Sequence, residues 1–432
     1  MSWRLTENLA EKITHYSSFP ATGVSLRQMV QFGQRPNAGT LFRGAQFLSE
    51  ELPIRLAHRV RELDHLPDGL SDMPSIQRVR NWYAQSFEDL TELPRPKIPK
   101  ELRDLLIEAQ KKHSNGHTRT TLAETTANPS LEDEHKGPPA TRKRSRLNNR
   151  RYYVLLDDHI KWSPEIYEYN KQFTKCLSNI KRRHDPVVAT VAQGINEYKL
   201  SRQRMQIDST IQSFLDRFYM SRIGIRMLIG QHISISEGPA RDNYVGVICT
   251  KTNLRELAME AIESARFICE DYYGLFAAPT VQLVCKPDLN FMYVPGHLSH
   301  MLFETLKNSL RAVVETHGAD ASEFPPVKLI VAEGKEDITI KISDEGGGIP
   351  RSAIPLVWTY MYTTVQSTPS LDPDENNSDF KAPMAGFGYG LPLSRLYARY
   401  FGGDLKLISM EGYGTDVYLH LNRLSTSSEP LQ

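Results

Sequence analysis

The chain has 432 residues, of which 40% are hydrophobic and 24% are charged, and its formal net charge is +1. This composition is typical of a globular protein, and the length suggests two domains. A near-zero net charge gives no overall attraction to nucleic acid. No apolar run approaches the ~20 residues that a membrane-spanning helix needs. We therefore expect neither a nucleic-acid partner nor membrane insertion.

The cysteines and the N-terminus bear on the compartment. Cys176, Cys249, Cys269 and Cys285 are far apart and form no CxxC pair. This spacing predicts reduced thiols rather than a disulfide framework or a zinc site. The first residues are amphipathic but acidic, whereas transit peptides are rich in arginine and poor in acids. A mitochondrial presequence is therefore not evident from these residues.

The N-terminal part has mostly helical periodicity, from Leu5 to about Leu177. Breaks are expected at Gly23, Pro36, Gly39, Pro53, Pro67 and Pro94. Residues 115–151 differ, because they hold few large apolar residues and pass from an acidic to a basic run. Such a composition cannot bury enough surface to become ordered, so it predicts a mobile loop. Its basic TRKRSR sequence could bind an acidic protein or nucleic acid, although a solvated loop is favoured.

Helical periodicity resumes from Pro164 to about Gln231. Within it, Arg222 and Arg226 lie one turn apart in a strongly apolar segment. Buried arginines need anions or carboxylates beside them, so we expect such partners here. A structural ion pair and an anion-binding pocket both satisfy this expectation.

After Gly238 the pattern becomes α/β. Residues 253–274 predict a helix, and strands are expected at 280–286, 328–334, 338–344, 405–411 and 415–422. Interleaved strands and helices predict an α/β sandwich, with one layer of helices on a mixed sheet. Residues 365–385 are polar, acidic and rich in proline, which is typical of a flexible lid over a bound ligand.

Residues 297–315 predict a helix with two distinct faces. The polar face carries His300, Glu304, Lys307, Asn308 and Arg311, and the apolar face carries Leu302, Leu306, Leu310 and Val313. An ordinary surface helix also has a polar face, so this helix alone does not decide between a site and a solvated surface.

Three glycine-rich sequences follow this helix. Asp344 ends a strand and precedes Gly346 to Gly348, which let the backbone turn tightly near a ligand. The sequence GFGYGLP at 386–392 precedes a helix whose free N–H groups suit phosphate. The sequence GYGT at 412–415 is expected in a hairpin turn. Four elements in this order are a much stronger signal than one glycine motif.

The four elements resemble the nucleotide-binding boxes of the GHKL ATPases, which include DNA gyrase and the histidine kinases. The match is closer to the mitochondrial kinases of 2-oxo-acid dehydrogenase complexes, and within them to pyruvate dehydrogenase (acetyl-transferring) kinases of fungal type. The sequences that carry it are HMLFExxKNxxRA, SDxGGGIP, YMYTT, GFGYGLPLSRLYARYFGGDL, HYSSFPATGVSLRQMVQFG, RRHDPVVATVAQGINEYK and FLDRFYMSRIGIRMLIGQH. The resemblance covers nearly the whole chain, apart from two insertions and the C-terminus.

The resemblance implies an α + α/β fold in two domains. Residues 1–235 would form a regulatory, lipoyl-domain-binding four-helix bundle with a mobile insertion at about 115–151. Residues 236–432 would form a GHKL (Bergerat-type) ATP-binding kinase domain with a lid at about 365–385. The animal pyruvate dehydrogenase kinases carry an Asp-Trp motif in a longer tail, and this chain lacks it.

The implied function is that of an ATP-dependent protein serine kinase in the mitochondrial matrix. It would phosphorylate and inactivate the E1 alpha subunit of the pyruvate dehydrogenase complex. Its other partners would be the lipoyl domain of the E2 acetyltransferase core and a second copy of the chain. Two alternatives stay open, namely a kinase of the branched-chain 2-oxo-acid complex and an ATP-gated GHKL binding protein that transfers no phosphate.

The residues suggest the roles, and the resemblance assigns them to the same positions. Glu304 is a candidate general base, and His300, one turn earlier, can tune it. Asn308 supplies a neutral oxygen to Mg²⁺, and K⁺ is a further possible cofactor. Asp344 can accept a hydrogen bond from the adenine amino group. The full ATP-binding set is Glu304, Lys307, Asn308, Arg311, Asp344, Gly346, Gly348, Thr363, Thr364, Gly386, Phe387, Gly388, Tyr389, Gly390, Leu391 and Thr415.

The resemblance also implies a pocket for a small carboxylate effector in the helical domain. Its residues would be Tyr83, Lys181, His184, Ser221, Arg222, Ile225 and Arg226. His184 is alternatively a phospho-acceptor, as in bacterial relatives that phosphorylate a histidine. Its RRHDP setting favours the protein-serine kinases instead.

Overall fold

The computed structural model describes residues 3–34, 36–96, 162–202, 208–239, 241–364 and 388–431. These residues fall into two compact units. The first takes Met1–Gln206 with Ile225–Ala240, and the second takes Ile207–Gly224 with Arg241–Pro430. Residues 207–224 thus group with the second unit, whereas a single cut after residue 235 was expected. The insertion and lid expected at 115–151 and 365–385 lie outside the described residues.

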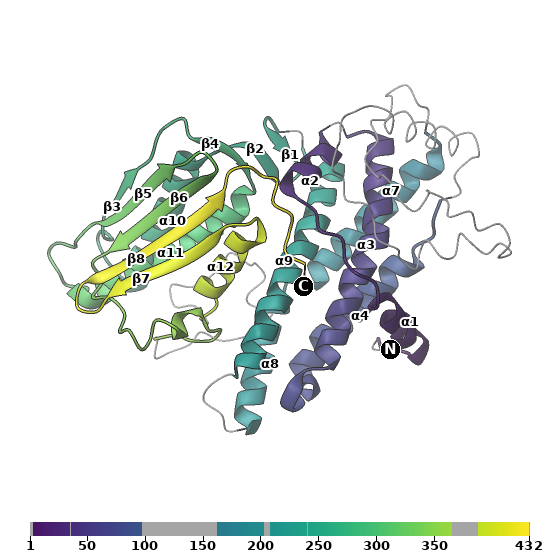
Figure 1. Ribbon diagram of the computed structural model, residues 1–432, viewed down its shortest axis with the longest axis horizontal. Coiled ribbons are helices and arrows are strands. Elements are labelled where there is room, and N and C mark those ends of the chain that lie inside the picture. The colour runs from purple at the N-terminus through teal and green to yellow at the C-terminus, as the bar shows by residue number, and fades with distance from the viewer. Residues whose placement is uncertain are drawn as a thin grey trace. The chain divides into compact units, whose positions relative to one another are not determined.

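The first unit is helical (Figure 1). Its elements are α1 (Glu7–Tyr16), α2 (Leu26–Gly33), α3 (Ala38–Asp64), the 3₁₀ helix η1 (Pro67–Asp72), α4 (Pro74–Glu92), α7 (Pro164–Arg183), α8 (Val187–Arg202) and the later turns of α9 (Ser209–Glu237). Their apolar stripes meet in a core that includes Phe42, Leu52, Phe87, Phe173 and Val191, each at most 1% exposed. Polar caps begin several helices, such as the capping box of Ser25 with Gln28.

Helix α3 corrects two of the expected breaks. It runs without interruption through Gly39 and Pro53, from Ala38 to Asp64. The neighbours Leu52 and Ile54 are fully or almost fully buried, and this burial offsets the hydrogen bond that the proline cannot donate. At Gly39 a Cβ atom would lie 2.0 Å from the Trp162 ring, so the glycine permits close packing rather than ending the helix.

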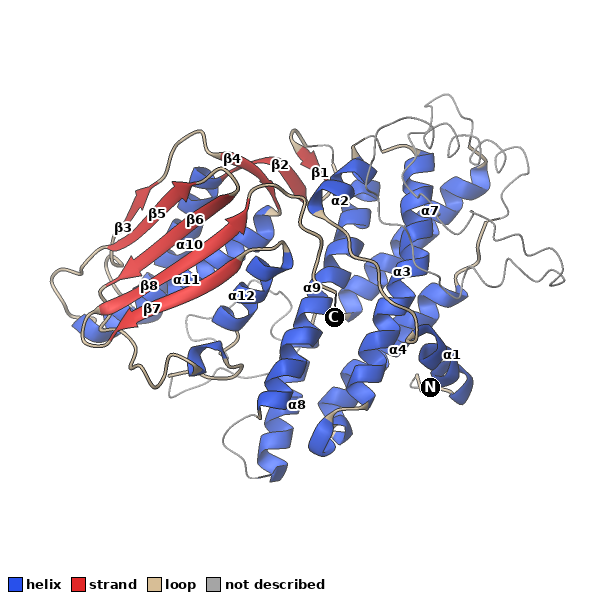
Figure 2. Cartoon of the chain, in the orientation of Figure 1, coloured by secondary structure: helices blue, strands red, loops and turns tan. Residues whose placement is uncertain are grey.

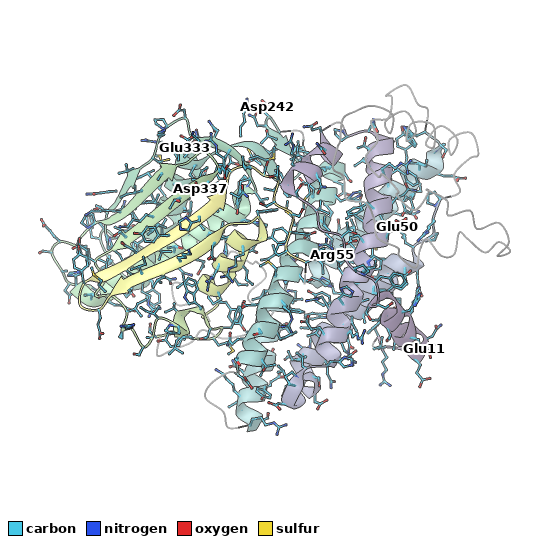
Figure 3. All side chains as sticks on the ribbon, in the orientation of Figure 1. Glu11, Glu50, Arg55, Asp242, Glu333 and Asp337 are labelled. Carbon is cyan, nitrogen blue, oxygen red and sulfur yellow. The ribbon has the colours of Figure 1, made fainter. Side chains whose placement is uncertain are left out.

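Charged side chains are also buried in the first unit. Arg55, labelled in Figure 3, pairs with Glu51 at 2.7 Å and donates to the carbonyl of Thr22 at 2.7 Å. Glu51 in turn accepts from the backbone N–H of Thr22 at 2.8 Å. Each charge therefore has a partner, which is the condition for burying it without a large desolvation cost. The network fixes the segment before α2 against α3.

The second unit contains a mixed five-stranded sheet (Figure 2). Its order is β3-β5-β6-β8-β7, built from β3 (Val281–Val284), β5 (Val327–Glu333), β6 (Asp337–Asp344), β7 (Asp404–Met410) and β8 (Gly414–Asn422). Only β3 and β5 pair in parallel; the other pairs are antiparallel. These strands match the five expected from alternation, and Met410 pairs with Gly414 across the expected hairpin.

Three helices cover one face of this sheet in Figure 2, α10 (Leu254–Tyr273), α11 (Pro295–His317) and α12 (Gly390–Tyr400). Strand β6 turns Ile338, Ile340 and Ile342 toward them, all at most 2% exposed. Because side chains alternate along a strand, Asp344 lies on this same buried face. A second, three-stranded sheet of β1 (Tyr244–Val245), β2 (Ile248–Asn253) and β4 (Asn290–Tyr293) had not been expected.

All four cysteines are free thiols. Burial raises the pKa of the Cys176 and Cys269 thiols to about 11, so little reactive thiolate forms at neutral pH. Among the described residues, no helix combines the length and the apolar character needed to cross a membrane.

Candidate functional site

The polar face of α11 is the centre of the site. On its other face Leu302, Leu306 and Leu310 are fully buried, which fixes the rotation of the helix about its axis. Glu304 and Lys307 are only 6% and 1% exposed, and Lys307 Nζ lies 2.9 Å from Glu304 Oε1. Each therefore compensates the charge of the other. Lys307 was expected to face phosphate, and in the structure its ammonium contacts Glu304.

The first turn of α12 contacts the carboxylate of Glu304. A Cβ atom built on Gly390 would lie 2.2 Å from Glu304 Oε2, so a larger residue at this helix end would force the acid to shift. The N–H groups of a first helical turn have no partner within the helix and carry partial positive charge. The carboxylate thus lies beside a helix end that suits phosphate. The two elements are far apart in the sequence.

Asp344 ends β6 and is 5% exposed. Its Oδ1 accepts from the backbone N–H groups of Gly346 at 3.1 Å and Thr415 at 3.3 Å. Burial raises the pKa of this carboxyl, while a hydrogen bond from the Ser309 side chain and the two backbone bonds act in the opposite direction. The carboxyl group is therefore held in one orientation by three donors.

The glycines after Asp344 stand where neighbouring atoms leave no room for a side chain. A Cβ atom on Gly346 would lie 2.5 Å from the Cβ of Ala312 on α11. Gly348 has a φ of 70°, and a Cβ atom there would lie 2.0 Å from the carbonyl oxygen of Met410. The turn therefore packs between α11 and the β7–β8 hairpin, and larger residues would separate these elements. Figure 1 shows β7 and β8 as the two yellow strands of the sheet.

Arg311 links α11 to the segment that follows η5 (Leu356–Trp358). Its Nη2 donates to the Thr364 hydroxyl at 2.9 Å, and its Nε donates to Glu315 Oε1 at 2.8 Å. The guanidinium is therefore oriented by a carboxylate on one side and a hydroxyl on the other. A cation held in this way can contribute charge to a phosphate without losing much conformational entropy.

The remaining candidates belong to the described residues, apart from two. His300 lies one turn before Glu304, and its ring centroid is 5.2 Å from that of Tyr397. Asn308 is half-buried one turn after Glu304. Thr363, Gly388, Tyr389 and Leu391 are described, whereas Gly386 and Phe387 lie outside the described residues.

The described side chains of this region offer few oxygen ligands to a magnesium ion. Among the described residues no group of three His, Cys, Asp or Glu side chains could hold a metal ion. A protein cage of carboxylates is therefore not present in that part of the chain. Magnesium commonly binds through one protein ligand, several waters and the phosphates of a nucleotide. A single amide oxygen, such as that of Asn308, fits this second arrangement.

Comparisons with known proteins agree with this geometry. The family model described as histidine kinase-, DNA gyrase B- and HSP90-like ATPase matches residues 293–425. The model described as mitochondrial branched-chain alpha-ketoacid dehydrogenase kinase matches residues 23–249, more than half of the chain. A mitochondrial pyruvate dehydrogenase (acetyl-transferring) kinase of Schizosaccharomyces pombe is 50% identical over 99% of both chains. The chain belongs to the mitochondrial 2-oxo-acid dehydrogenase kinase family.

Two further relatives support the assignment of this chain as a pyruvate dehydrogenase kinase. A pyruvate dehydrogenase (acetyl-transferring) kinase of Arabidopsis thaliana is 42% identical over 98% of this chain and 97% of its own. Isozyme 3 of the mouse enzyme is 39% identical over 98% of this chain and 86% of its own. Both are named as mitochondrial enzymes. The second unit of the kinase is accordingly an ATP-binding domain of the GHKL class.

The expected effector residues lie on several helices. In the first unit the rings of Tyr83 and His184 stack with centroids 4.4 Å apart, and His184 Nε2 is 3.0 Å from the Ser86 hydroxyl. Arg226 pairs with Asp185 at 2.8 Å, so the expectation of a carboxylate partner is met for this arginine. The remaining expected residues are Lys181 and Ile225 in the first unit and Ser221 and Arg222 in the second.

Sequence reasoning missed three features of the site. The buried pairing of Lys307 with Glu304 gives no sequence signal beyond an i, i+3 spacing. The bond from Ser309 to Asp344 joins residues on separate elements, and serine is too common to single out. Tyr360 belongs to the quoted YMYTT sequence but was given no role, although it is 2% exposed. Burial and side-chain pairing of this kind are visible only in the folded chain.

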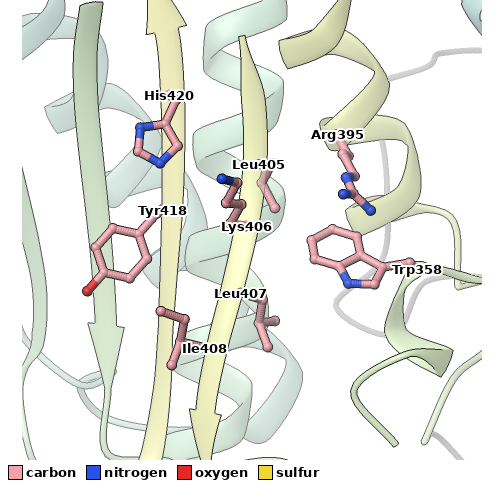
Figure 4. A pocket seen from close by; sticks show the side chains of 8 residues that line it. All are labelled: Trp358, Arg395, Leu405, Lys406, Leu407, Ile408, Tyr418 and His420. Carbon is pink, nitrogen blue, oxygen red and sulfur yellow. The ribbon is translucent and has the colours of Figure 1, made fainter.

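A hollow in the second unit lies elsewhere. It measures about 510 Å³ and is shown in Figure 4, between the side chains of β7 and β8 and those of Trp358 and Arg395. The Arg395 guanidinium lies 4.5 Å from the centroid of the Trp358 ring. None of the expected ATP-binding residues lines this hollow. We therefore do not associate it with the nucleotide.

Proposed function

We propose that this kinase transfers the γ-phosphoryl group of ATP to a serine of the E1 alpha subunit of the pyruvate dehydrogenase complex, inactivating that complex in the mitochondrial matrix. The observation that carries the proposal is the contact between Glu304 and the first turn of α12. It unites a candidate base and a phosphate-binding helix end. An ATP-gated binding protein would have no need of a carboxylate at that point.

In the proposed reaction the serine oxygen forms a bond to the γ-phosphorus, and the bond from that phosphorus to the β,γ-bridging oxygen breaks. ADP leaves, and the hydroxyl proton passes to Glu304. Lys307, whose Nζ lies 2.9 Å from Glu304 Oε1, would hold this side chain in place. The free N–H groups of α12 would hold the phosphates in place.

The remaining residues would bind and orient the nucleotide. Asp344, fixed by Gly346 and Thr415, would accept a hydrogen bond from the adenine amino group and so select adenine. Arg311 would place its charge near the phosphates. Asn308 would hold the Mg²⁺ that accompanies ATP, and this ion neutralises phosphate charge. K⁺ is a further proposed cofactor without an assigned ligand.

The test is phosphate transfer from γ-labelled ATP to purified pyruvate and branched-chain E1 components. We expect preferential labelling of pyruvate E1 alpha on serine, because the relatives reported above are pyruvate dehydrogenase kinases. Preferential labelling of the branched-chain E1 would instead favour the alternative substrate. Labelling of neither, with ATP still bound, would support the non-transferring alternative.

The Glu304→Gln variant separates chemistry from binding. Glutamine keeps the size and polarity of the side chain, so Mg-ATP binding should remain. A positioned base is worth about 10²–10⁴-fold in rate, and the loose transition state of phosphoryl transfer places our expectation near 10²-fold. Single-turnover transfer at saturating ATP measures this loss.

A matched control for this variant is Glu333→Gln. Glu333 is a β5 carboxylate that pairs with Lys286 at 3.0 Å and Arg423 at 2.9 Å, outside the candidate site. It should transfer phosphate at the wild-type rate. Wild-type transfer by Glu304→Gln would exclude Glu304 as the base.

We also propose that the helical unit binds the lipoyl domain of the E2 core. An apolar cavity of about 60 Å³ lies among α2, α3 and α9, and its lining includes Met29, Phe47, Leu228, His232 and Ile235. Apolar pockets with few polar groups suit apolar ligands. A lipoyl arm, which is an aliphatic chain ending in a dithiolane ring, has this character.

Blocking the cavity tests this partner. The Ile235→Lys variant places a charge at the half-buried edge of the cavity, and it should weaken binding of lipoylated E2 domain by tenfold or more in calorimetry. Leu200→Lys is the control, because Leu200 is 81% exposed on α8. Equal binding by both variants would show that the cavity is not used.

A homodimer is the third proposed partnership. The sheet strands expose the apolar side chains of Val284, Ile330, Ile408 and Met410, which are between 38% and 61% exposed. Val284 and Ile330 lie on the neighbouring strands β3 and β5, and Ile408 and Met410 lie on β7 at the other edge of the sheet. Exposed apolar groups on a sheet surface favour protein–protein contact. Sedimentation equilibrium would give twice the chain mass if the proposal holds, and the chain mass if it does not.

A further inference from the structure

Three tyrosines form a buried aromatic cluster in the second unit. Tyr219 comes from α9, Tyr360 from the segment after η5, and Tyr389 from the residue before α12. Their ring centroids are 5.3 to 5.8 Å apart, and each side chain is at most 6% exposed. Burial is the main cause that raises the pKa of all three hydroxyls, so they remain neutral. The cluster joins three segments that are distant in the sequence.

Tyr360 is the member whose backbone N–H and hydroxyl are both bound by α9. Its backbone N–H donates to the Gln212 side-chain oxygen at 3.0 Å, and its hydroxyl donates to Asp216 Oδ1 at 2.7 Å. Gln212 and Asp216 are four residues apart, so they lie on one face of the helix. A hydrogen bond to a carboxylate is shorter and stronger than one between neutral groups. Helix α9 therefore fixes both ends of this residue.

The residues after Tyr360 form one wall of the glycine loop. The N–H of Met361 donates to the Gly388 carbonyl at 3.2 Å. Gly388 has a φ of 75°, and a Cβ atom there would lie 2.4 Å from the Tyr362 carbonyl oxygen. Two positions farther along, the Thr364 hydroxyl accepts the bond from Arg311. One short segment thus contacts both the loop and a proposed phosphate-binding cation.

We propose that Tyr360, held by Gln212 and Asp216, is a positioning residue for the phosphate-binding loop. In this role it acts through Met361 and Tyr362 on Gly388 rather than on the nucleotide itself. Donors in a nucleotide site act at full strength only when they are held in place before the ligand binds. The inference rests on the proposed use of this loop for the phosphates of ATP.

The Tyr360→Phe variant tests the inference, because it removes one hydroxyl and keeps the ring in the cluster. We expect Kd for Mg-ATP to rise by about five- to tenfold, which is less than the full effect of losing a hydrogen bond to a charged group, because Tyr360 acts on the ligand only through the loop. Affinity for adenosine should stay within twofold, because adenosine has no phosphates for the loop to bind. Calorimetry with both ligands measures this difference, which a merely structural role would not produce.

Tyr400→Phe is the matched control. Tyr400 is equally buried, belongs to the last turn of α12, and donates its hydroxyl to Glu429. It should lose stability without losing ATP affinity. If Tyr360→Phe also lost only stability, or lost adenosine and ATP affinity equally, the positioning role would be wrong.

Substitutions of Asp216 give an independent check. Asp216→Asn keeps an oxygen that can accept from Tyr360, so it should bind ATP nearly as wild type does. Asp216→Ala should lower ATP affinity as much as Tyr360→Phe does. The double variant should bind ATP no more weakly than either single variant, because both substitutions remove the same Tyr360–Asp216 hydrogen bond. Additive losses would overturn the inference. Binding is measured without phosphate transfer, so a wild-type protein that bound ATP but labelled no dehydrogenase would contradict only the proposed function.

Discussion

Asp344 in the second unit and His232 in the first are both more than nine-tenths buried, but their surroundings differ. The Asp344 carboxyl accepts from two backbone N–H groups, and burial raises its pKa. The His232 ring lines an apolar cavity, its Nε2 has no hydrogen-bond partner among the described residues, and burial lowers its pKa to about 4. The carboxyl is oriented by donors, whereas the imidazole is simply kept neutral. A polar group that is already held in one orientation suits the binding of a polar ligand.

The contrast between Asp344 and His232 can be tested by substitution. We expect the largest effect for Asp344→Asn, on nucleotide binding. The two backbone N–H groups would keep the amide oxygen in the place of Oδ1. The NH₂ group would then meet the amino group of adenine, donor against donor. We expect ATP affinity to fall at least tenfold by calorimetry, because an unpaired buried polar group costs roughly 1–3 kcal/mol.

The same variant should not lose folding stability. Because burial penalises the charged form of Asp344, a neutral side chain of the same shape removes that penalty. Urea denaturation at pH 7.5 should give an unfolding free energy at least equal to that of the wild type. A clear loss of stability together with unchanged ATP affinity would make Asp344 a structural group and would remove the contrast with His232.

A smaller effect is expected from His232, and it concerns pH. The unfolded chain protonates this histidine near pH 6.5, whereas the folded chain resists protonation down to about pH 4. Between these values the unfolded state binds more protons, so this stabilising contribution is present above pH 6.5 and is lost as the pH falls. At pH 5.5, one unit below the unfolded pKa, we expect this effect to lower the free energy of unfolding by about 1.4 kcal/mol, since one pH unit corresponds to 1.36 kcal/mol.

The measurement for His232 is urea denaturation of wild type and His232→Leu at pH 7.5 and 5.5. The variant should lack the part of the pH dependence that the histidine causes, and its ATP affinity should equal that of wild type at pH 7.5. An identical loss of stability on acidification in both proteins would show that other groups dominate. Binding of the lipoylated domain by the same variant would report whether the ring or the cavity shape matters.

Much of the fold could be predicted because its signals are local. The alternation of Ile338, Ile340 and Ile342 predicted β6, and the glycines at 412 and 414 predicted the β7–β8 hairpin. The continuous helix α3 was missed, since Gly39 and Pro53 are helix breakers by intrinsic preference and only their packing overrides this. Strand β1 was missed because a two-residue strand carries no periodic signal.

The candidate site divides in the same way. The spacing of Glu304, Lys307 and Asn308 on one helix face could be read from the sequence. The contact of Gly390 with Glu304 could not, because 85 residues separate them and chain closure over that distance leaves no local trace. The bond of Tyr360 to Asp216 spans 144 residues and is hidden for the same reason.

The backbone of Met361 is strained beside the loop that we propose binds phosphate. Its φ of 64° is a left-handed conformation that residues other than glycine rarely adopt, at a cost of order 1–3 kcal/mol. Such strain persists only where neighbouring contacts outweigh it, and here these are the anchoring of Tyr360 on one side and the bond to Gly388 on the other. The strained turn is therefore held closed by these two sets of contacts. Loss of either contact would release this strain, so the backbone at Met361 would change conformation abruptly rather than by gradual loosening.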